Sequence, residues 1–253
     1  MTPKENIACP VCGEACALLD VVDFNKSCED GKGKVFDLAG FAVYYALCSH
    51  CGFCFAPEIS KWGLEEFEKR IYNEEYALVD PDYINARPRA NASNLISMFG
   101  DKILSVKHLD YGGGSGLLTN LLKQSNWQSV SYDPFVDRDV SIGGLGKFDL
   151  ITAYEVFEHV PDVHELMSNL LTLLSADGIV LFSTLLSDGN INTNQRLSWW
   201  YASPRNGHIS LFSRNSLAFL AHKYGINFGS FSQGFHIFYT KVPFWAEHLT
   251  RRN

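Results

Sequence analysis

The stretch HLDYGGGSG, residues 108–116, lies between a short apolar run and a segment whose leucines have helical spacing. Glycines at such a turn let the backbone approach a ligand closely and adopt conformations that a Cβ would forbid. The first turn of the following helix offers backbone N–H groups to a carboxylate or a phosphate. The stretch therefore predicts a strand, a ligand-binding turn and a helix in succession.

Short apolar runs alternate with amphipathic segments around this turn, as they do in βαβ units. The runs predict buried strands at residues 106–111, 129–133, 148–154 and 179–184. Helices are expected over 117–122, over 163–174 behind a capping box of Asp162 and Glu165, and over 213–224. Residues 227–231 and 235–240 are expected to close the sheet as an antiparallel hairpin. The predicted fold class is α/β, a doubly wound, mostly parallel, seven-stranded Rossmann-like sheet.

The bulk composition of the 253 residues is that of an ordinary globular protein, with 46% hydrophobic and 19% charged residues. No apolar run approaches the roughly 18 residues that cross a bilayer. Residues 1–6 lack the basic start and apolar stretch of a secretion signal, so we expect a cytoplasmic chain. The net charge of −7 disfavours a nucleic-acid partner, because such binding depends largely on Lys and Arg that neutralise phosphates.

All seven cysteines lie at positions 9 to 54, and an odd number without a secretion signal does not suggest a disulfide framework. Two knuckles of the form C-x-x-C-G, 35 residues apart, fit a zinc-ribbon-like module with an inserted hairpin. The expected ligands of a structural zinc are Cys9, Cys12, Cys48 and Cys51. The alternative is a group of free, partly buried thiols. The other three cysteines are expected to be spare, although Cys54 is close enough in sequence to replace one ligand.

Composition divides the chain into three consecutive parts. Residues 1–60 form the expected zinc-binding module, 61–100 a helical connector or substrate lid, and 101–253 the Rossmann-like domain. Leu64, Phe67 and Ile71 have helical spacing in the connector, which Pro81 and Pro88 interrupt.

The second expected strand ends in a carboxylate, Asp133, which lies 17 residues after Gly116. An acid at this place can accept both hydroxyls of an unmodified ribose, so the turn and the acid together indicate an adenosine-type cofactor. The alternatives are a purely structural turn or a dinucleotide site, whose turn normally reads G-x-G-x-x-G. Asp110, just before the glycines, would repel a pyrophosphate but attract the cationic amino-acid part of a sulfonium cofactor.

Four segments resemble successive motifs of the class I S-adenosylmethionine-dependent methyltransferases: LDYGGGSG, VSYDP, FDLITAYEVFEHVPD and GIVLFST, in that order over residues 106–184. The resemblance implies S-adenosylmethionine as methyl donor and S-adenosylhomocysteine as product. It implies that Asp133 holds the ribose, and that Tyr154 and Glu155 border the cofactor. The residues implied to line its methionine end are Asp110, Gly112, Gly113, Gly114 and Gly116.

Glu155, Glu158 and His159 would share one face of a helical turn. Such a face could hold a metal ion or place a general base above the methyl group. The segment resembles the same stretch of the small-molecule O-methyltransferases of quinone biosynthesis, where a divalent ion has been proposed. The alternative is a structural or cofactor-covering turn.

A zinc module ahead of such a core resembles two groups of enzymes. One group is the sugar C-methyltransferases of nucleotide-linked deoxysugars, whose knuckles precede a tyrosine-rich helical segment, as Tyr72, Tyr76 and Tyr83 do here. The other is the ribosomal-RNA guanine methyltransferases, whose expected basic face does not suit a net charge of −7. The first resemblance implies a nucleotide sugar or other glycoconjugate precursor as the small-molecule acceptor.

Residues 199–213, WWYASPRNGHISLFS, would follow a strand at the carboxyl edge of the sheet, where ligands bind. The segment resembles the GH-x-x-x-[FY]-S stretch of methyltransferases from polysaccharide and glycolipid gene sets. Its aromatic rings are expected to form a substrate wall with Arg205, Asn206 and His208. His208 is the predicted general base, with His159 as the alternative base and Tyr76 as a partner. The structural alternative is that His208 orders the loop.

The predicted reaction is displacement at the sulfonium methyl by an oxygen or carbon of a small polar acceptor. Three other hypotheses remain: an RNA or protein methyltransferase, another nucleotide-dependent enzyme, and a catalytically silent scaffold that binds zinc and cofactor.

Overall fold

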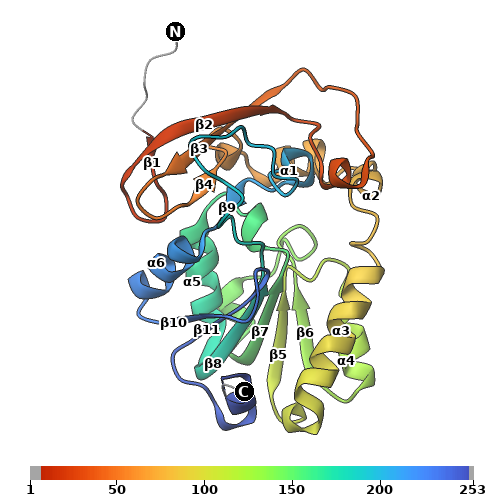
Figure 1. Ribbon diagram of the computed structural model, residues 1–253. Coiled ribbons are helices and arrows are strands. Elements are labelled where there is room, and N and C mark those ends of the chain that lie inside the picture. The colour runs from red at the N-terminus through yellow and green to blue at the C-terminus, as the bar shows by residue number, and fades with distance from the viewer. Residues whose placement is uncertain (1–6, 251–253) are drawn as a thin grey trace. The chain divides into compact units, whose positions relative to one another are not determined.

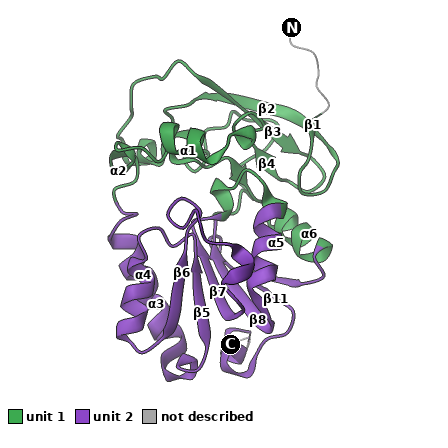
Figure 2. Cartoon of the chain, turned by 180° about the vertical axis from the view of Figure 1, so that it is seen from behind, with its two compact units in different colours: residues 1–81, 157–164, 185–223 green, residues 82–156, 165–184, 224–253 purple. Residues whose placement is uncertain are grey.

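The computed structural model describes residues 7–250, whose contacts form two compact units that interleave along the chain (Figure 2). Unit 1 comprises residues 7–81, 157–164 and 185–223, and unit 2 comprises residues 82–156, 165–184 and 224–250. This division differs from the three consecutive parts expected at 1–60, 61–100 and 101–253. The expected connector divides after residue 81, and two later segments return to unit 1.

A six-stranded sheet forms the centre of unit 2, in the order β10-β11-β8-β7-β5-β6 (Figure 1). Its parallel strands are β5 (Lys107–Tyr111), β6 (Gln128–Tyr132), β7 (Phe148–Tyr154) and β8 (Leu174–Ser183). The expected hairpin consists of β10 (Asn227–Ser230) and β11 (Phe235–Tyr239), and β11 also pairs antiparallel with β8. The chain runs from β5 to β6 on one side and then to β7 on the other. The sheet is therefore doubly wound, with its switch point at β5.

The sheet has one strand fewer than the seven expected. Between β6 and β7 the described residues form turns and a 3-10 helix, η4 (Ile142–Gly144), instead of a strand. The three glycines within residues 143–146 have no side chains to pack on a sheet, and glycine loses more backbone entropy than other residues when a strand fixes it. β6 is consequently the edge strand on this side.

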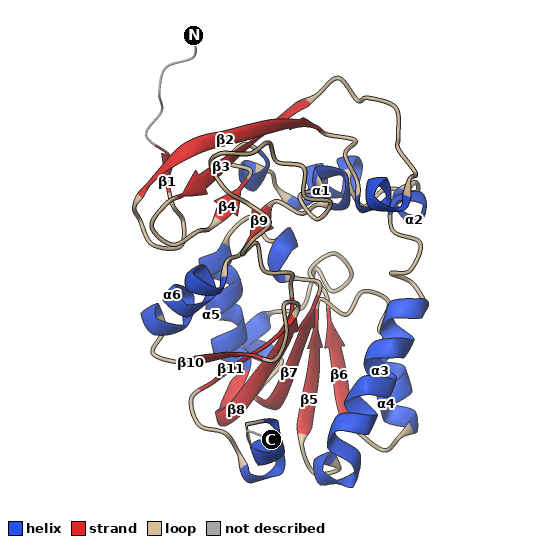
Figure 3. Ribbon diagram, in the orientation of Figure 1, coloured by secondary structure: helices blue, strands red, loops and turns tan. Residues whose placement is uncertain are grey.

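Two helices, α3 (Ala86–Phe99) and α4 (Leu117–Gln124), lie side by side against this sheet (Figure 3). Leu95 of α3 and Leu122 of α4 are buried in one cluster with Leu150 and Ile179 of the sheet. Burying each such side chain contributes roughly 1.5–3 kcal/mol, which is why these apolar stripes set the positions of the helices. The remaining helices named for this unit are η3 (Gly100–Ile103), η7 (Phe244–Leu249) and most of α5 (Val163–Leu173).

Unit 1 is built on a five-stranded antiparallel sheet in the order β1-β2-β3-β4-β9. The strands are β1 (Ile7–Ala8), β2 (Ala15–Asp23), β3 (Ala42–Cys48), β4 (Cys54–Phe55) and β9 (Ser210–Leu211). The β2–β3 hairpin occupies the sequence between the two knuckles, as expected. β9 pairs with β4, placing Cys54 opposite Leu211. This pairing is one reason why residues after 185 belong to the same unit as the cysteine-rich segment.

Short helices complete unit 1: η1 (Cys28–Lys32), η2 (Ile59–Lys61), α1 (Leu64–Arg70), α2 (Tyr76–Val79), η5 (Phe157–His159), η6 (Pro204–Asn206) and α6 (Arg214–Lys223). Phe67 and Ile71 are buried as their spacing predicts, whereas Leu64 is exposed. Ser213 begins α6 as expected, since its Oγ accepts the Ser216 N–H at 3.0 Å. Over residues 7–250, no helix combines the length and apolar character that crossing a membrane requires.

Candidate cofactor site, histidine cluster and zinc site

The glycine turn follows β5 and leads into α4, at the switch point of the sheet. Gly112, Gly114 and Gly116 have φ angles of 75°, 52° and 75°, in the left-handed region that favours glycine. A Cβ on Gly112 would lie 2.5 Å from Val156 Cγ2, and one on Gly113 would lie 2.7 Å from Asp110 Oδ2. The turn therefore excludes side chains and brings bare backbone to the carboxyl edge of the sheet.

Asp133 lies directly after β6 and is held against this turn. Its Oδ2 accepts the Gly114 N–H at 3.0 Å, and its Oδ1 accepts the Phe135 N–H at 2.9 Å. A carboxylate oxygen has two lone pairs, so each oxygen can accept one further hydrogen bond. Asp133 can thus receive two hydroxyl donors beside the glycine turn.

Asp110 is buried at the end of β5, where its Oδ1 accepts a hydrogen bond from Thr152 Oγ1 at 2.9 Å. Burial raises the pKa of this carboxyl to about 7, the Thr152 hydroxyl opposes that shift, and the nearby negative charge of Asp133 adds to it. Among the described residues, Asp110 has no cationic partner. An ammonium group of a ligand would hold it in its ionised form.

Tyr154 ends β7, and Glu155 follows it with a φ of 53°, an unusual value for a residue that is not glycine. Ser183 Oγ accepts the Glu155 N–H at 2.8 Å and donates to Glu155 Oε1 at 2.8 Å. The expected helical face of Glu155, Glu158 and His159 is therefore wrong, because this left-handed residue precedes the helical turn η5. Strained backbone that neighbouring groups hold in place is common at functional sites.

Glu158 and His159 instead gather with His208 inside unit 1. One candidate ligand atom from each of these three residues lies within 4.8 Å of the others. The Tyr201 hydroxyl donates a short hydrogen bond to Glu158 Oε1. His208 Nδ1 lies 2.8 Å from the Tyr201 carbonyl oxygen, which can only accept, so Nδ1 carries the hydrogen and Nε2 the lone pair. The group could serve as a proton acceptor or hold a divalent cation.

Tyr72 and Tyr76, from the segment expected to be a connector, extend this cluster. The rings of His159 and His208 lie 4.9 Å apart, those of Tyr72 and His159 6.2 Å, and those of Tyr72 and Tyr76 5.1 Å. A Cβ on Gly207 would lie 3.0 Å from His159 Nδ1, so glycine is what permits this approach. The three predicted catalytic residues thus belong to one chain of ring contacts. Tyr76 lies at its far end, where its hydroxyl donates to the Asn206 carbonyl at 3.3 Å.

Arg205 and Asn206 have structural roles instead of forming the expected substrate wall. The Arg205 guanidinium donates to the Ile71 carbonyl at 3.0 Å and to Asn73 Oδ1 at 3.2 Å. The Asn206 amide oxygen accepts the Cys28 N–H at 2.8 Å. Both side chains are buried and hold the loop in place, which their polarity alone did not reveal.

The four knuckle cysteines converge as predicted. Cys9 Sγ lies 3.6 Å from Cys51 Sγ, and Cys12 Sγ lies 3.5 Å from Cys48 Sγ. A tetrahedral zinc with Zn–S bonds of about 2.3 Å requires sulfurs about 3.8 Å apart, so the cluster fits this ion. The Cys51 thiol donates to the Cys9 sulfur and lowers the pKa of Cys9 to about 5. Cys54 lies outside the group of four in the described residues.

Each knuckle closes with a glycine in the left-handed region. The Gly13 N–H donates to the Cys9 carbonyl and the Gly52 N–H to the Cys48 carbonyl, both at 2.9 Å. Ser213, the first-turn cap of α6, donates to the Cys51 carbonyl at 2.6 Å. The candidate zinc site is therefore anchored to α6 of the same unit.

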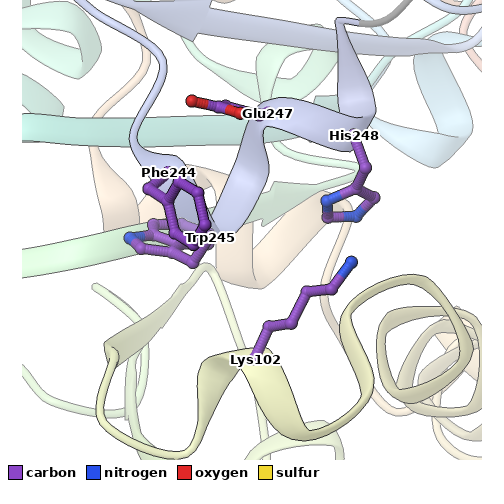
Figure 4. Close-up of a pocket in the computed structure, with 5 residues that line it drawn as sticks. All are labelled: Lys102, Phe244, Trp245, Glu247 and His248. Carbon is purple, nitrogen blue, oxygen red and sulfur yellow. The ribbon is translucent and has the colours of Figure 1, made fainter.

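A hollow at the end of unit 2 away from the glycine turn is lined by Lys102, Phe244, Trp245, Glu247 and His248 (Figure 4). Its residues come from η3 and η7, at the amino ends of the parallel strands, and include none of the predicted site residues. Ligands of doubly wound sheets bind at the carboxyl ends. The glycine turn is therefore the better candidate for a cofactor site.

A doubly wound sheet with a glycine turn and two acids at its switch point defines a nucleotide-cofactor-binding α/β protein. A family described as a methyltransferase domain matches residues 67–228, more than half of the chain. The chain belongs to this methyltransferase family.

Individual relatives match shorter stretches. The ubiquinone biosynthesis O-methyltransferase of Glaesserella parasuis serovar 5 is 31% identical over 84 residues, which are 32% of this chain and 36% of the relative. That of Colwellia psychrerythraea is 33% identical over 57 residues, 22% of this chain and 23% of the relative. The chain thus spans little more than a third of the length of the first and less than a quarter of the second.

Two solved structures are similar to parts of this chain at low identity. The magnesium protoporphyrin IX methyltransferase of Synechocystis PCC 6803 with bound SAH has a TM-score of 0.45 and 14% identity, over 69% of this chain and 92% of that one. An O-methyltransferase family protein from Burkholderia thailandensis has a TM-score of 0.46 and 11% identity, over 70% and 63% of the two chains.

Proposed function

We propose that this chain transfers the methyl group of S-adenosylmethionine to a small polar acceptor. The observation that carries the proposal is the carboxylate of Asp133, fixed by the Gly114 N–H beside a turn that excludes side chains. In the proposal Asp133 accepts the two ribose hydroxyls and buried Asp110 pairs with the α-ammonium group. Gly112, Gly113 and Gly116 let the methionine portion approach the backbone, and Tyr154 and Glu155 border the cofactor.

The chemistry is an in-line displacement. An acceptor oxygen or carbon forms a bond to the methyl carbon while the carbon–sulfur bond breaks and its electron pair stays on sulfur, giving S-adenosylhomocysteine. The acceptor loses one proton, which the enzyme takes up. Alignment of the two partners supplies most of the rate enhancement, and proton transfer adds roughly 10²–10⁴-fold where the acceptor is weakly acidic.

His208 is the proposed proton acceptor. Its Nδ1–H is committed to the Tyr201 carbonyl, which leaves the lone pair on Nε2. The Tyr201 hydroxyl also donates to Glu158, so a single residue contacts both the proposed base and a carboxylate of the same cluster. His159 is the alternative base. Tyr76 packs against Tyr72, whose ring contacts that of His159, and is proposed to hold these rings in position.

The proposed acceptor is a nucleotide sugar or another glycoconjugate precursor. Support comes from the resemblance of the knuckles and the tyrosine-rich segment to sugar methyltransferases, and from a net charge of −7 that disfavours RNA. The bound zinc is proposed to be structural, since four thiolates leave no open coordination position. The seven cysteines form no disulfide with one another, which suits a reducing compartment such as the cytoplasm.

Methyl transfer to a panel of sugar nucleotides tests the proposal. We expect turnover with at least one sugar nucleotide, and binding to a labelled oligonucleotide that stays weak when the salt concentration is lowered. Strong, salt-sensitive oligonucleotide binding without sugar-nucleotide binding would reverse the assignment of the acceptor. A thermal shift with NAD but none with S-adenosylhomocysteine would replace the methyltransferase by a dinucleotide enzyme. Cofactor binding without turnover on any acceptor would favour the silent scaffold.

A further inference from the structure

A histidine occupies a position of β5 where a parallel strand normally carries an apolar side chain. His108 is fully buried between the two neighbouring strands. Its Nδ1 lies 2.7 Å from Ser129 Oγ of β6, and its Nε2 lies 3.0 Å from Thr152 Oγ1 of β7. Burial lowers the pKa of this imidazole to about 3, so it is neutral at physiological pH.

The contacts continue at both ends and reach the cofactor site. Ser129 Oγ lies 3.1 Å from Thr119 Oγ1 of α4, and Thr152 Oγ1 lies 2.9 Å from Asp110 Oδ1. Thr119, Ser129, His108, Thr152 and Asp110 therefore form one buried, unbranched chain of hydrogen bonds. Asp110 is the acid to which the proposed function gives the cofactor ammonium.

Such a chain has a direction, because each hydroxyl has one hydrogen and a neutral imidazole has one. When Asp110 is ionised it can only accept, so Thr152 donates to it and must accept from His108. The imidazole hydrogen is then on Nε2, and Nδ1 accepts from Ser129. In the structure Ser129 donates to Thr119, so this bond reverses in the ionised state and Thr119 donates to Ser129. Every hydrogen bond in the chain is satisfied in this arrangement.

The direction reverses when Asp110 takes up a proton from solvent and donates to Thr152. The Thr152 hydroxyl then donates to Nε2, and the imidazole hydrogen lies on Nδ1, donating to Ser129. The whole chain has gained one proton, and the other hydrogens are only redistributed. No heavy atom needs to move, because each hydroxyl rotates and the ring changes its tautomer.

We propose that His108 is a positioning residue of the cofactor site, whose tautomer is coupled through Thr152 to the protonation of Asp110 and therefore to cofactor occupancy. The inference rests on the proposed function, because it takes Asp110 as the partner of the ammonium group. The charged and titratable groups that face Asp110 are Asp133, whose negative charge favours the protonated acid, and Tyr154 at the end of β7. Neither can supply the positive charge that ionises Asp110 near neutral pH.

Nuclear magnetic resonance of ¹⁵N-histidine-labelled protein tests the coupling directly. In ligand-free protein we expect the His108 hydrogen on Nδ1 at about pH 5.5 and on Nε2 at about pH 8.5, with the change near pH 7, where Asp110 titrates. Saturation with S-adenosylhomocysteine at the lower pH should move the hydrogen to Nε2. A single His108 tautomer across this range, with and without bound ligand, would overturn the proposal.

Thr152→Val removes the link while keeping the shape of the side chain, and Thr152→Ser is the matched control that retains the hydroxyl. In Thr152→Val we expect the imidazole hydrogen of His108 to stay on Nδ1 at every pH. The affinity for S-adenosylhomocysteine at pH 7 should fall about tenfold or more, since Asp110 loses a hydrogen-bond donor. Thr152→Ser should keep the wild-type titration. The same pH dependence of the His108 tautomer in both variants would refute the relay. If Thr152→Val proves too unstable to measure, the wild-type spectra still test the relay.

The relay and the proposed function can each be refuted without the other. If wild-type protein binds no S-adenosylhomocysteine but its His108 tautomer still changes near pH 7, the proposed function fails and the relay remains. If the ligand binds and the tautomer does not respond, the relay fails and the proposed function remains.

Discussion

Replacing Asp110 with Asn separates the effect of this residue on stability from its effect on cofactor affinity. The folded chain raises the pKa of Asp110 from 3.8 to about 7, chiefly through burial. A folded state that raises the pKa of an acid binds its proton more tightly than the unfolded state does. Asp110 therefore lowers stability as the pH rises from about 4 to about 7, and its full cost remains above pH 7.

The size of this cost follows from the shift. About three pKa units at about 1.4 kcal/mol each give roughly 4 kcal/mol as an upper limit. Asn has nearly the same shape, remains neutral and can still accept the Thr152 hydroxyl. We expect Asp110→Asn to be more stable than the wild type by up to roughly 4 kcal/mol at about pH 8, with a smaller difference at about pH 5. For a chain of this size the midpoint of thermal unfolding should rise by roughly 2–4 °C per kcal/mol.

Binding should change in the opposite direction. The wild type should bind S-adenosylhomocysteine with constant affinity above about pH 7 and lose roughly tenfold per pH unit below it, because only the ionised acid pairs with the ammonium group. Asp110→Asn should bind at least roughly tenfold more weakly at about pH 8 and lose that pH dependence. Thermal unfolding and calorimetric titration at several pH values measure both effects. A variant no more stable than the wild type would contradict the burial cost assigned to Asp110, and unchanged affinity would contradict its pairing with the ammonium group.

Four further predictions follow from the other sites. Cys12→Ser should lower the bound zinc from one ion per chain and cost several kcal/mol of stability, as measured by metal analysis and thermal unfolding; an unchanged metal content would contradict the assignment of the four cysteine ligands. Gly112→Ala should abolish S-adenosylhomocysteine binding, since its Cβ would lie 2.5 Å from Val156 Cγ2 at a φ of 75°, and normal affinity would show that the turn is not the site. Glu155→Gly should gain roughly 1 kcal/mol of stability by relieving the left-handed φ, and a loss would mean that the Ser183 contacts outweigh the strain. His208→Gln should lower kcat roughly 10²–10⁴-fold while leaving S-adenosylhomocysteine affinity unchanged; an unaffected kcat would move the base to His159.

Local features of the molecule were predictable from the sequence because they depend on neighbouring residues. The strand before the glycine turn, the Asp162 and Ser213 caps, and the terminal hairpin each follow from spacing within a short segment. The cluster of four knuckle cysteines was also predictable, because each knuckle sets two ligands locally and a tetrahedral ion needs only two such pairs.

Features that depend on distant parts of the chain were not predictable. Two-residue β9 pairs with β4 across more than 150 residues, and no periodicity marks so short a strand. Arg205 and Asn206 looked like ligand-binding residues, but their partners are backbone groups and side chains that the sequence does not place nearby. The positive φ of Glu155 was also not predictable, since glutamate is not a residue type that favours this conformation.

The proposed function depends above all on binding of the adenosine cofactor by Asp133 and the glycine turn. Calorimetric titration of zinc-loaded protein with S-adenosylhomocysteine, for the wild type and Asp133→Ala, tests it most directly. We expect one binding site per chain in the wild type and an affinity roughly 10- to 100-fold lower in the variant, because two charge-assisted hydrogen bonds to the ribose are lost. Absence of binding heat in the wild type, or equal affinities in the two proteins, would contradict it.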